Sequence, residues 1–207
     1  RLVDDPPDRE GALRLFARYE TAQERATPEV LYPELLTSVH ARLRAHLGVE
    51  GSAELDVGFG RSIGDWPAYP DTVSALVYLK QHYQLVILSN VDRASFARTN
   101  EQLGVDFDAI YTAQDIGSYK PDPRNFAYML EHLQRRGVET SEILHTAQSL
   151  YHDHAPATDV GLATNWIDRR QDADGYGATV APRREVRVDF RFSSMAAFVQ
   201  AHRSGGA

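Results

Sequence analysis

The fold is decided by Leu85-Val86-Ile87-Leu88-Ser89-Asn90 and, further along the chain, by Ser118-Tyr119-Lys120-Pro121-Asp122-Pro123. The first segment is an apolar run that ends in a hydroxyl and an amide, which predicts a buried parallel strand with polar side chains at its carboxyl end. Ligands of open α/β sheets bind at that edge. In the second segment, a proline directly after Lys120 restricts the lysine backbone to extended conformations and so aims its ammonium group.

Around these two segments the pattern alternates between helices and strands. Strands are expected at 84–88, 109–112, 143–147, 163–167 and 186–190, and helices at 72–82, 93–103, 123–136, 155–160 and 194–202. This alternation predicts an α/β fold with a doubly wound parallel sheet.

The part of the chain before this alternation has helical spacing only. Apolar residues recur at helical intervals over 9–26, 35–47 and 53–63, and Pro28 and Pro33 are expected to interrupt between the first two helices. We therefore expect a small helical cap subdomain at 8–64 and an α/β core at 65–207.

The composition is that of a globular protein of ordinary polarity. The chain has 207 residues, of which 43% are hydrophobic and 25% charged, and its net charge is −7. An acidic balance argues against nucleic acid as the main partner, because phosphate binding needs a basic surface. No apolar run reaches the roughly 18–20 residues that span a bilayer, so no membrane segment is expected. The chain has no cysteine, which excludes disulfides and thiolate catalysis and agrees with a cytoplasmic location.

Three motifs resemble those of one superfamily. Leu88-Ser89-Asn90, Tyr119-Lys120-Pro121-Asp122 and Gln148-Ser149-Leu150-Tyr151-His152-Asp153, followed by Trp166-Ile167-Asp168-Arg169, resemble the haloacid dehalogenases, in particular the type II L-2-haloacid dehalogenase branch. The resemblance implies a hydrolase that uses an aspartyl-ester intermediate to displace halide from a small 2-haloalkanoic acid and yields a 2-hydroxy acid. It also implies a homodimer that needs no cofactor.

The same resemblance assigns roles to the motif residues. It implies that Lys120, Asp153, Ser149 and Ser89 are catalytic, and that Ser89 and Asn90 bind the carboxylate region of the substrate. The residues by themselves leave simpler alternatives open. Ser89 and Asn90 could form a turn that caps the helix beginning near residue 93, and a single loop lysine is usually solvated.

Two aromatic residues are candidates for an apolar substrate pocket. Trp66 lies at the predicted junction of cap and core, and Phe126 stands where the well-known dehalogenases carry a tyrosine. Either ring could line the pocket for the carbon and halogen of the substrate. The alternative for both rings is packing in the core. The cap-side arginine of the family has no assigned counterpart, with Arg14 and Arg18 as candidates.

The segment from Gln148 to Asp153 bears on metal use. Gln148 stands where the magnesium phosphatases of the superfamily carry the first of two acids, and Asp153 matches the second. A neutral amide is a poor ligand in a hard-cation site, so no metal is expected, and a magnesium phosphatase is the alternative function. His152 and His154 flank Asp153, and an extended loop would point both rings away from that carboxylate, which disfavours a transition-metal site.

The expected nucleophile is missing from the sequence. The superfamily begins with a strand that carries an Asp-x-x-Gly-Thr pattern, and no such pattern occurs in the chain. The resemblance places this strand in the middle of the sheet, beside the strands that end near Ser89 and Asp153. We therefore expect the nucleophilic Asp to lie upstream of Arg1. A catalytically silent protein with the same fold is the other alternative.

Overall fold

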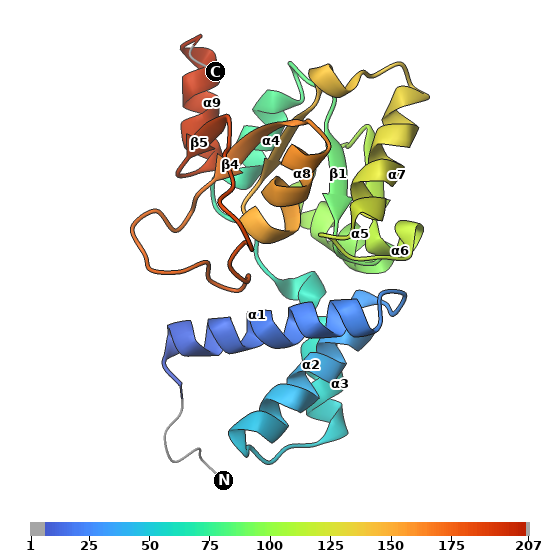
Figure 1. Cartoon of the computed structure of the whole chain (residues 1–207), viewed down its shortest axis with the longest axis vertical. Coiled ribbons are helices and arrows are strands. Elements are labelled where there is room, and N and C mark those ends of the chain that lie inside the picture. The colour runs from blue at the N-terminus through green and yellow to red at the C-terminus, as the bar shows by residue number, and fades with distance from the viewer. Residues whose placement is uncertain (1–6, 206–207) are drawn as a thin grey trace.

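The computed structural model describes residues 7–205. It contains a helical unit, which lies in the lower part of Figure 1, and an α/β unit, which lies in the upper part. The helical unit consists of α1 (Arg9–Ala26), α2 (Tyr32–Leu47) and α3 (Ala53–Arg61), followed by the short 3-10 helix η1 (Ser62–Asp65). The predicted boundary between residues 64 and 65 falls inside η1. We call the helical unit the cap and the α/β unit the core.

The ends of the cap helices follow from local chemistry. Asp8 is the N-cap of α1, and its carboxylate accepts a hydrogen bond from the backbone N–H of Gly11 at 2.6 Å. Gly48 ends α2 with a φ of 65°, a left-handed conformation that glycine adopts without steric cost. Pro33 does not interrupt the chain as expected but lies in the first turn of α2. Proline is tolerated there because the first N–H groups of a helix have no partner within the helix.

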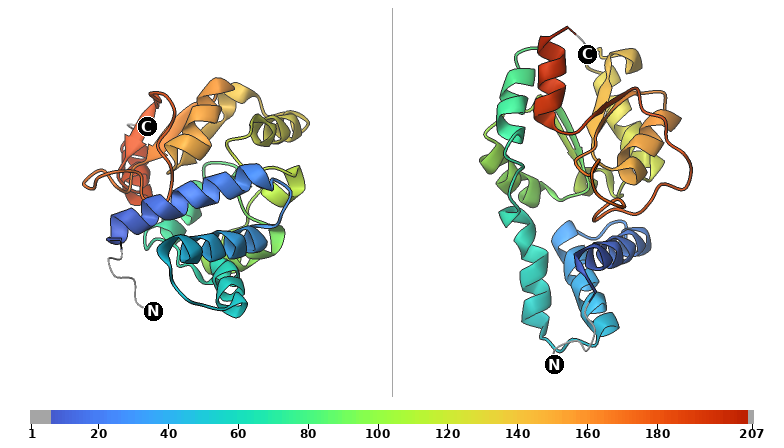
Figure 2. Two further views of the ribbon diagram at one scale, coloured as in Figure 1. Left: turned by 60° about the horizontal axis from the view of Figure 1, so that its bottom comes forward. Right: turned by 90° about the vertical axis from the view of Figure 1, so that its left-hand side faces the viewer.

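The core alternates strands and helices as expected. Its elements are α4 (Thr72–Leu79), β1 (Val86–Ser89), α5 (Arg93–Leu103), β2 (Ala109–Thr112), α6 (Ala113–Ile116), α7 (Pro123–Gln134), η2 (Thr140–Glu142), β3 (Leu144–Ala147), η3 (Leu150–His154), α8 (Ala155–Asp159), β4 (Ala163–Ile167), β5 (Phe190–Phe192) and α9 (Met195–Arg203). The helices lie on both sides of the strands in the turned views of Figure 2. The α/β class with parallel strands is therefore confirmed. None of the helices in the described part of the chain is long and apolar enough to cross a membrane.

The parallel strands form two separate sheets. β1 pairs with β2, and β3, β4 and β5 pair in that order, with every pair parallel. Within residues 7–205, no strand hydrogen-bonds β1 to β3. β1 and β3 thus each have a strand partner on one side only. Strand edges of this kind carry unpaired backbone N–H and C=O groups.

The last strand lies further along the chain than expected. The sequence pattern predicted it at 186–190, whereas β5 spans Phe190–Phe192. The side chain of Asp189 accounts for the shift, because its carboxylate accepts hydrogen bonds from the backbone N–H of Thr164 at 2.8 Å and from the Thr164 hydroxyl at 3.0 Å. At this point the backbone N–H of Thr164 is bonded by the Asp189 side chain instead of by a backbone carbonyl of a neighbouring strand.

An apolar cluster joins the cap to the core. Leu35, Leu36 and Val39 of α2 are fully buried, and they belong to the same cluster as Ala113 and Tyr119 of the core. The Tyr119 hydroxyl also donates a hydrogen bond to the carbonyl of residue 30 in the cap. Because Tyr119 directly precedes the site lysine in the sequence, packing of the cap bears directly on the Lys-Pro segment.

Candidate functional site

The site is built around Lys120, which is held at both its backbone and its side chain. Asn90, just after β1, accepts from the Lys120 backbone N–H at 2.7 Å and donates to the Lys120 carbonyl at 3.0 Å. The Lys120 ammonium donates to the Leu88 carbonyl at 2.8 Å and to Asp153 Oδ1 at 2.6 Å. The lysine is only 7% exposed. It is therefore an ordered, buried cation at the carboxyl ends of the strands, and the alternative of a solvated loop lysine is excluded.

Asp153 is the buried counter-charge of Lys120. It is 8% exposed, and His145, on β3, donates to its Oδ1 at 3.3 Å. Burial alone would raise the pKa of Asp153, but the Lys120 charge and the hydrogen bond from His145 outweigh it and hold that pKa well below its usual range. Asp153 is thus an anion in the folded protein, and the pair carries no net charge.

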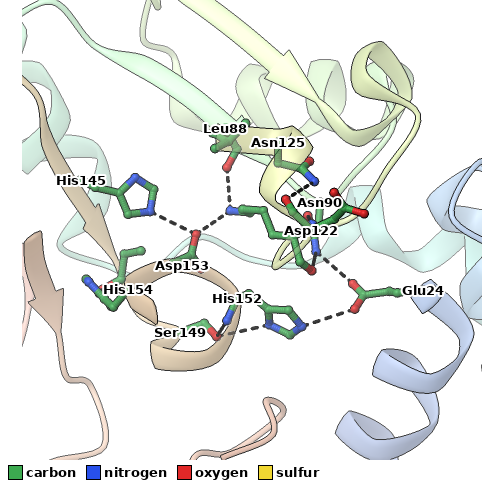
Figure 3. A network of polar contacts seen from close by, with 12 residues as sticks. Glu24, Leu88, Asn90, Asp122, Asn125, His145, Ser149, His152, Asp153 and His154 are labelled. Carbon is green, nitrogen blue, oxygen red and sulfur yellow. Dashed lines mark hydrogen bonds and ion pairs between the residues drawn. The ribbon is translucent and has the colours of Figure 1, made fainter. Parts of the chain in front are cut away.

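The residues around Asp153 are not arranged as the sequence suggested. Residues 150–154 form a π-helix, η3, instead of an extended loop, so alternation of side chains does not apply. Nε2 of His154 donates to the Ala147 carbonyl at 2.9 Å, whereas His152 faces the cap. Figure 3 shows His145 directed at Asp153, and His152 between Glu24 and Ser149. Among residues 7–205, no group of three His, Asp or Glu side chains is arranged to hold a metal ion.

The cap contributes Glu24, a site residue that the sequence did not reveal. Glu24 is 5% exposed and lies on α1. Its Oε1 accepts from Asn90 Nδ2 at 2.9 Å, and its Oε2 lies 3.3 Å from Nε2 of His152. Figure 3 shows Glu24 reaching from the cap helix toward both core residues. Glu24 shares a buried face of α1 with Ala17, Glu20 and Thr21, and the docking of the cap brings it to the strand ends.

A cavity of about 720 Å³ lies between the cap and the core beside these residues. Its lining includes Glu24 and Arg25 of α1, Lys120 and its neighbours, and Tyr151 of η3. The Arg25 guanidinium donates a hydrogen bond to the Tyr151 hydroxyl, which ties the cap helix to η3. Neither of the sequence candidates for a cap-side arginine, Arg14 and Arg18, lines this cavity.

The structure brings together most of the predicted site residues but not the aromatic ones. Ser89 lies at the end of β1, and Ser149 lies at the start of η3, four residues before Asp153. Phe126 is fully buried in the cluster under α7. Trp66 is 40% exposed and donates a hydrogen bond to Ser62 in η1. Neither ring lines the cavity. The structure therefore favours core packing for Phe126, and it places Trp66 in the segment that joins the cap to the core.

The end of β1 also answers an open alternative. The helix after β1 is capped by Asp92, whose carboxylate accepts from the backbone N–H of Ser95 at 3.0 Å. Ser89 and Asn90 are therefore not needed as the cap of α5. Asn90 is committed to Lys120 and Glu24 instead, which makes it a structural link between the two loops and the cap.

Known proteins resemble the chain in both sequence and fold. A family model described as a haloacid dehalogenase-like hydrolase matches residues 9–146. No curated protein sequence matches. Among solved structures, the L-2-haloacid dehalogenase PA0810 is 22% identical, with a TM-score of 0.75, and the match covers 95% of this chain and 86% of that one.

Two further structures extend the comparison. The L-2-haloacid dehalogenase of Xanthobacter autotrophicus with covalently bound chloropropionic acid is 19% identical over 95% of this chain and 88% of that one, with a TM-score of 0.76. The Bacillus subtilis protein YfnB, a HAD-hydrolase bound to magnesium, is 16% identical over 97% and 84%, with a TM-score of 0.72. At these identities the structures show a shared fold. The match of the family model over most of the chain shows that the protein belongs to the haloacid dehalogenase-like hydrolases.

Proposed function

We propose that this protein is a hydrolase that displaces halide from small 2-haloacids without a metal ion. The observation that carries the proposal is the buried ion pair of Lys120 and Asp153 at the carboxyl ends of the strands. A phosphatase would need a cation bound by carboxylates at this point. Here the lysine ammonium, 2.6 Å from Asp153, already neutralises the one carboxylate of the segment from Gln148 to Asp153, and Gln148 supplies only a neutral amide.

The resemblance implies that the nucleophile is an Asp on a further strand, which would pair with β1 and β3. Within residues 7–205, Asp153 is the only carboxylate that pairs with Lys120, and that pairing makes Asp153 unsuited to attack. The unpaired edges of β1 and β3 offer backbone partners to one more strand. Lys120 bridges the ends of both sheets through Leu88 and Asp153, so a carboxylate at the end of that strand would lie beside its ammonium group.

The reaction proceeds in two displacements. In the first, the Asp carboxylate attacks the carbon that bears the halogen, the new C–O bond forms as the carbon–halogen bond breaks, and halide leaves with the bonding electrons. In the second, water adds to the ester carbonyl of the enzyme, the Asp carboxylate is restored, and the 2-hydroxy acid and a proton are released. Lys120 stabilises the negative charge at the nucleophile. The resemblance gives Ser89 the carboxylate region of the substrate and gives Ser149 and Asp153 the positioning of the water, while Asn90 holds Lys120 in place.

The cavity supports a small anionic substrate. Arg25 brings a cation from the cap to the cavity wall, and its hydrogen bond to Tyr151 holds the guanidinium in place. A guanidinium can bind a carboxylate through two parallel hydrogen bonds. We therefore assign Arg25, rather than Arg14 or Arg18, as the residue that draws the substrate carboxylate into the cavity. A homodimer and a cytoplasmic location remain predictions from the sequence.

Halide release from 2-chloropropionate, measured with and without a chelator, tests the proposal. The expected result is halide release that the chelator does not change and that is lost in Lys120→Ala. A magnesium phosphatase is the second candidate, supported by the magnesium-bound neighbour from Bacillus subtilis. It predicts phosphate release from a phosphomonoester that requires magnesium. Activity that survives Lys120→Ala contradicts the first proposal, and no turnover of either substrate class supports the silent protein.

A further inference from the structure

Three buried side chains form a chain of contacts from the cap into the core. Glu24 of α1, His152 of η3 and Ser149 at the start of η3 are 5%, 8% and 7% exposed. Glu24 Oε2 lies 3.3 Å from His152 Nε2, and His152 Nδ1 lies 3.2 Å from the Ser149 hydroxyl oxygen. Figure 3 shows the imidazole between the carboxylate and the hydroxyl. Neither the proposed mechanism nor the motifs give His152 a role.

The hydrogen-bonding capacity of these groups limits their protonation states. The Ser149 oxygen accepts from the His152 backbone N–H at 3.0 Å. If the imidazole carries protons on both nitrogens, the charged ring forms an ion pair with Glu24 on its Nε2 side. Nδ1 then donates to Ser149, which fills both acceptor positions of the hydroxyl. The hydroxyl hydrogen is then free for a third partner. In a neutral ring whose remaining proton is on Nε2, facing Glu24, Nδ1 lacks a proton and the Ser149 hydroxyl must donate to it instead.

The surroundings of His152 favour the doubly protonated ring. Burial by itself lowers the pKa of His152, but contact with Glu24 and the nearby charges of Asp153 and Glu20 outweigh it, so the net pKa is raised. Asp153 is shared with Lys120, and the Tyr151 ring packs edge-on against the imidazole. Glu24 is the one anion in direct contact with the imidazole in the described part of the chain, so the cap supplies the charge that keeps the ring protonated.

We propose that Glu24 is a positioning residue: through His152, it forces the Ser149 hydroxyl to act as a hydrogen-bond donor toward the reacting groups. This role rests on the proposed function, since the partner of that donor is the substrate or the ester carbonyl. No other acceptor contacts the hydroxyl in residues 7–205, so its hydrogen is available. Docking of the cap then completes the site, because the carboxylate that sets the direction of this hydrogen arrives with α1.

Nuclear magnetic resonance of the histidine rings tests the proposal without any assay of activity. Two-bond ¹H–¹⁵N correlation spectra distinguish an imidazolium from each neutral tautomer, and loss of a signal in His152→Asn assigns the ring. We expect His152 to be doubly protonated at neutral pH in the wild type and neutral in Glu24→Gln. The glutamine keeps a side-chain oxygen that accepts the hydrogen bond from Asn90. Glu20→Gln is the matched control, because it removes the neighbouring buried carboxylate of the same helix, and it should leave the ring charged.

Kinetics then separate this inference from the proposed function. If halide release is observed, Ser149→Ala should lower kcat by about ten- to a hundredfold, as expected for loss of one donor in a buried site. Glu24→Gln should lower kcat by a similar factor, and the double variant should be no worse than Ser149→Ala. In the wild type, kcat should fall as the pH rises through the titration of His152 seen in the spectra. A neutral ring in the wild type, or additive effects of the two substitutions, would overturn the inference even if the enzyme releases halide.

Discussion

Replacement of Lys120 by methionine should destabilise the fold strongly at neutral pH. The substitution keeps most of the length of the side chain but removes the ammonium group that pairs with Asp153, and it leaves the Leu88 carbonyl without its lysine donor. Asp153 is 8% exposed, so water cannot replace the lost charge. Removal of one partner from a buried ion pair costs about 3–5 kcal/mol. The contact of His145 with the carboxylate at 3.3 Å favours the lower half of that range.

The pH dependence of this loss distinguishes an ion pair from simple packing. In the wild type the pKa of Asp153 is held below its unfolded value, so the pair contributes stability above the unfolded pKa, and this contribution is lost as the pH falls. In Lys120→Met the unpaired buried acid takes up a proton readily. The difference between the two proteins should therefore be largest at neutral pH and shrink below about pH 4.

Urea denaturation measures this difference through the midpoint and slope of unfolding. The double variant Lys120→Met, Asp153→Asn is the matched control, because a neutral amide needs no counter-charge and still accepts from His145. We expect it to recover a large part of the lost stability. A loss smaller than about 1 kcal/mol at neutral pH, or a loss that does not change at acidic pH, would refute the assignment of a buried ion pair.

Three other substitutions test separate parts of the structure. Burial and the nearby charge of Glu24 raise the pKa of Glu20 to about 7. Because this pKa lies above that of the unfolded chain, the stability that protonated Glu20 contributes is fully present below the unfolded pKa, and on the order of 3 kcal/mol of it is lost as the pH rises through 7. Glu20→Gln should remove this loss of stability when unfolding is measured at alkaline pH. Phe126→Ala should cost about 3–5 kcal/mol because the ring is fully buried, whereas Phe126→Leu should retain kcat and KM if the ring only packs. Arg25→Gln should raise KM for a 2-haloacid about tenfold or more with a smaller change in kcat, because the guanidinium binds the carboxylate before the reaction; an unchanged KM would remove Arg25 from the site.

Much of the fold and part of the site could be predicted from local patterns. The alternation of apolar runs with helical spacing predicted the parallel core, and the spacing over residues 9–26 predicted α1 with its observed bounds. Lys120 and Asp153 stood out because proline and strand ends restrict where they lie. The pattern failed at η3, where a π-helix replaced the expected loop, because that conformation depends on Ser149 accepting backbone hydrogen bonds and on contacts with the cap.

The sequence by itself determined which residues end the strands. An apolar run is a local pattern, and the polar residues that directly follow it mark the end of the strand. Only the tertiary structure decided what those residues contact. Glu24 lies 66 positions before Asn90 in the chain, and nothing in the helical pattern of α1 marks it as a site residue rather than as one more polar residue of a surface helix. Its place at the site follows from the apolar packing of α2 on the Lys-Pro segment, which docks the cap and buries the carboxylate against the imidazole of His152.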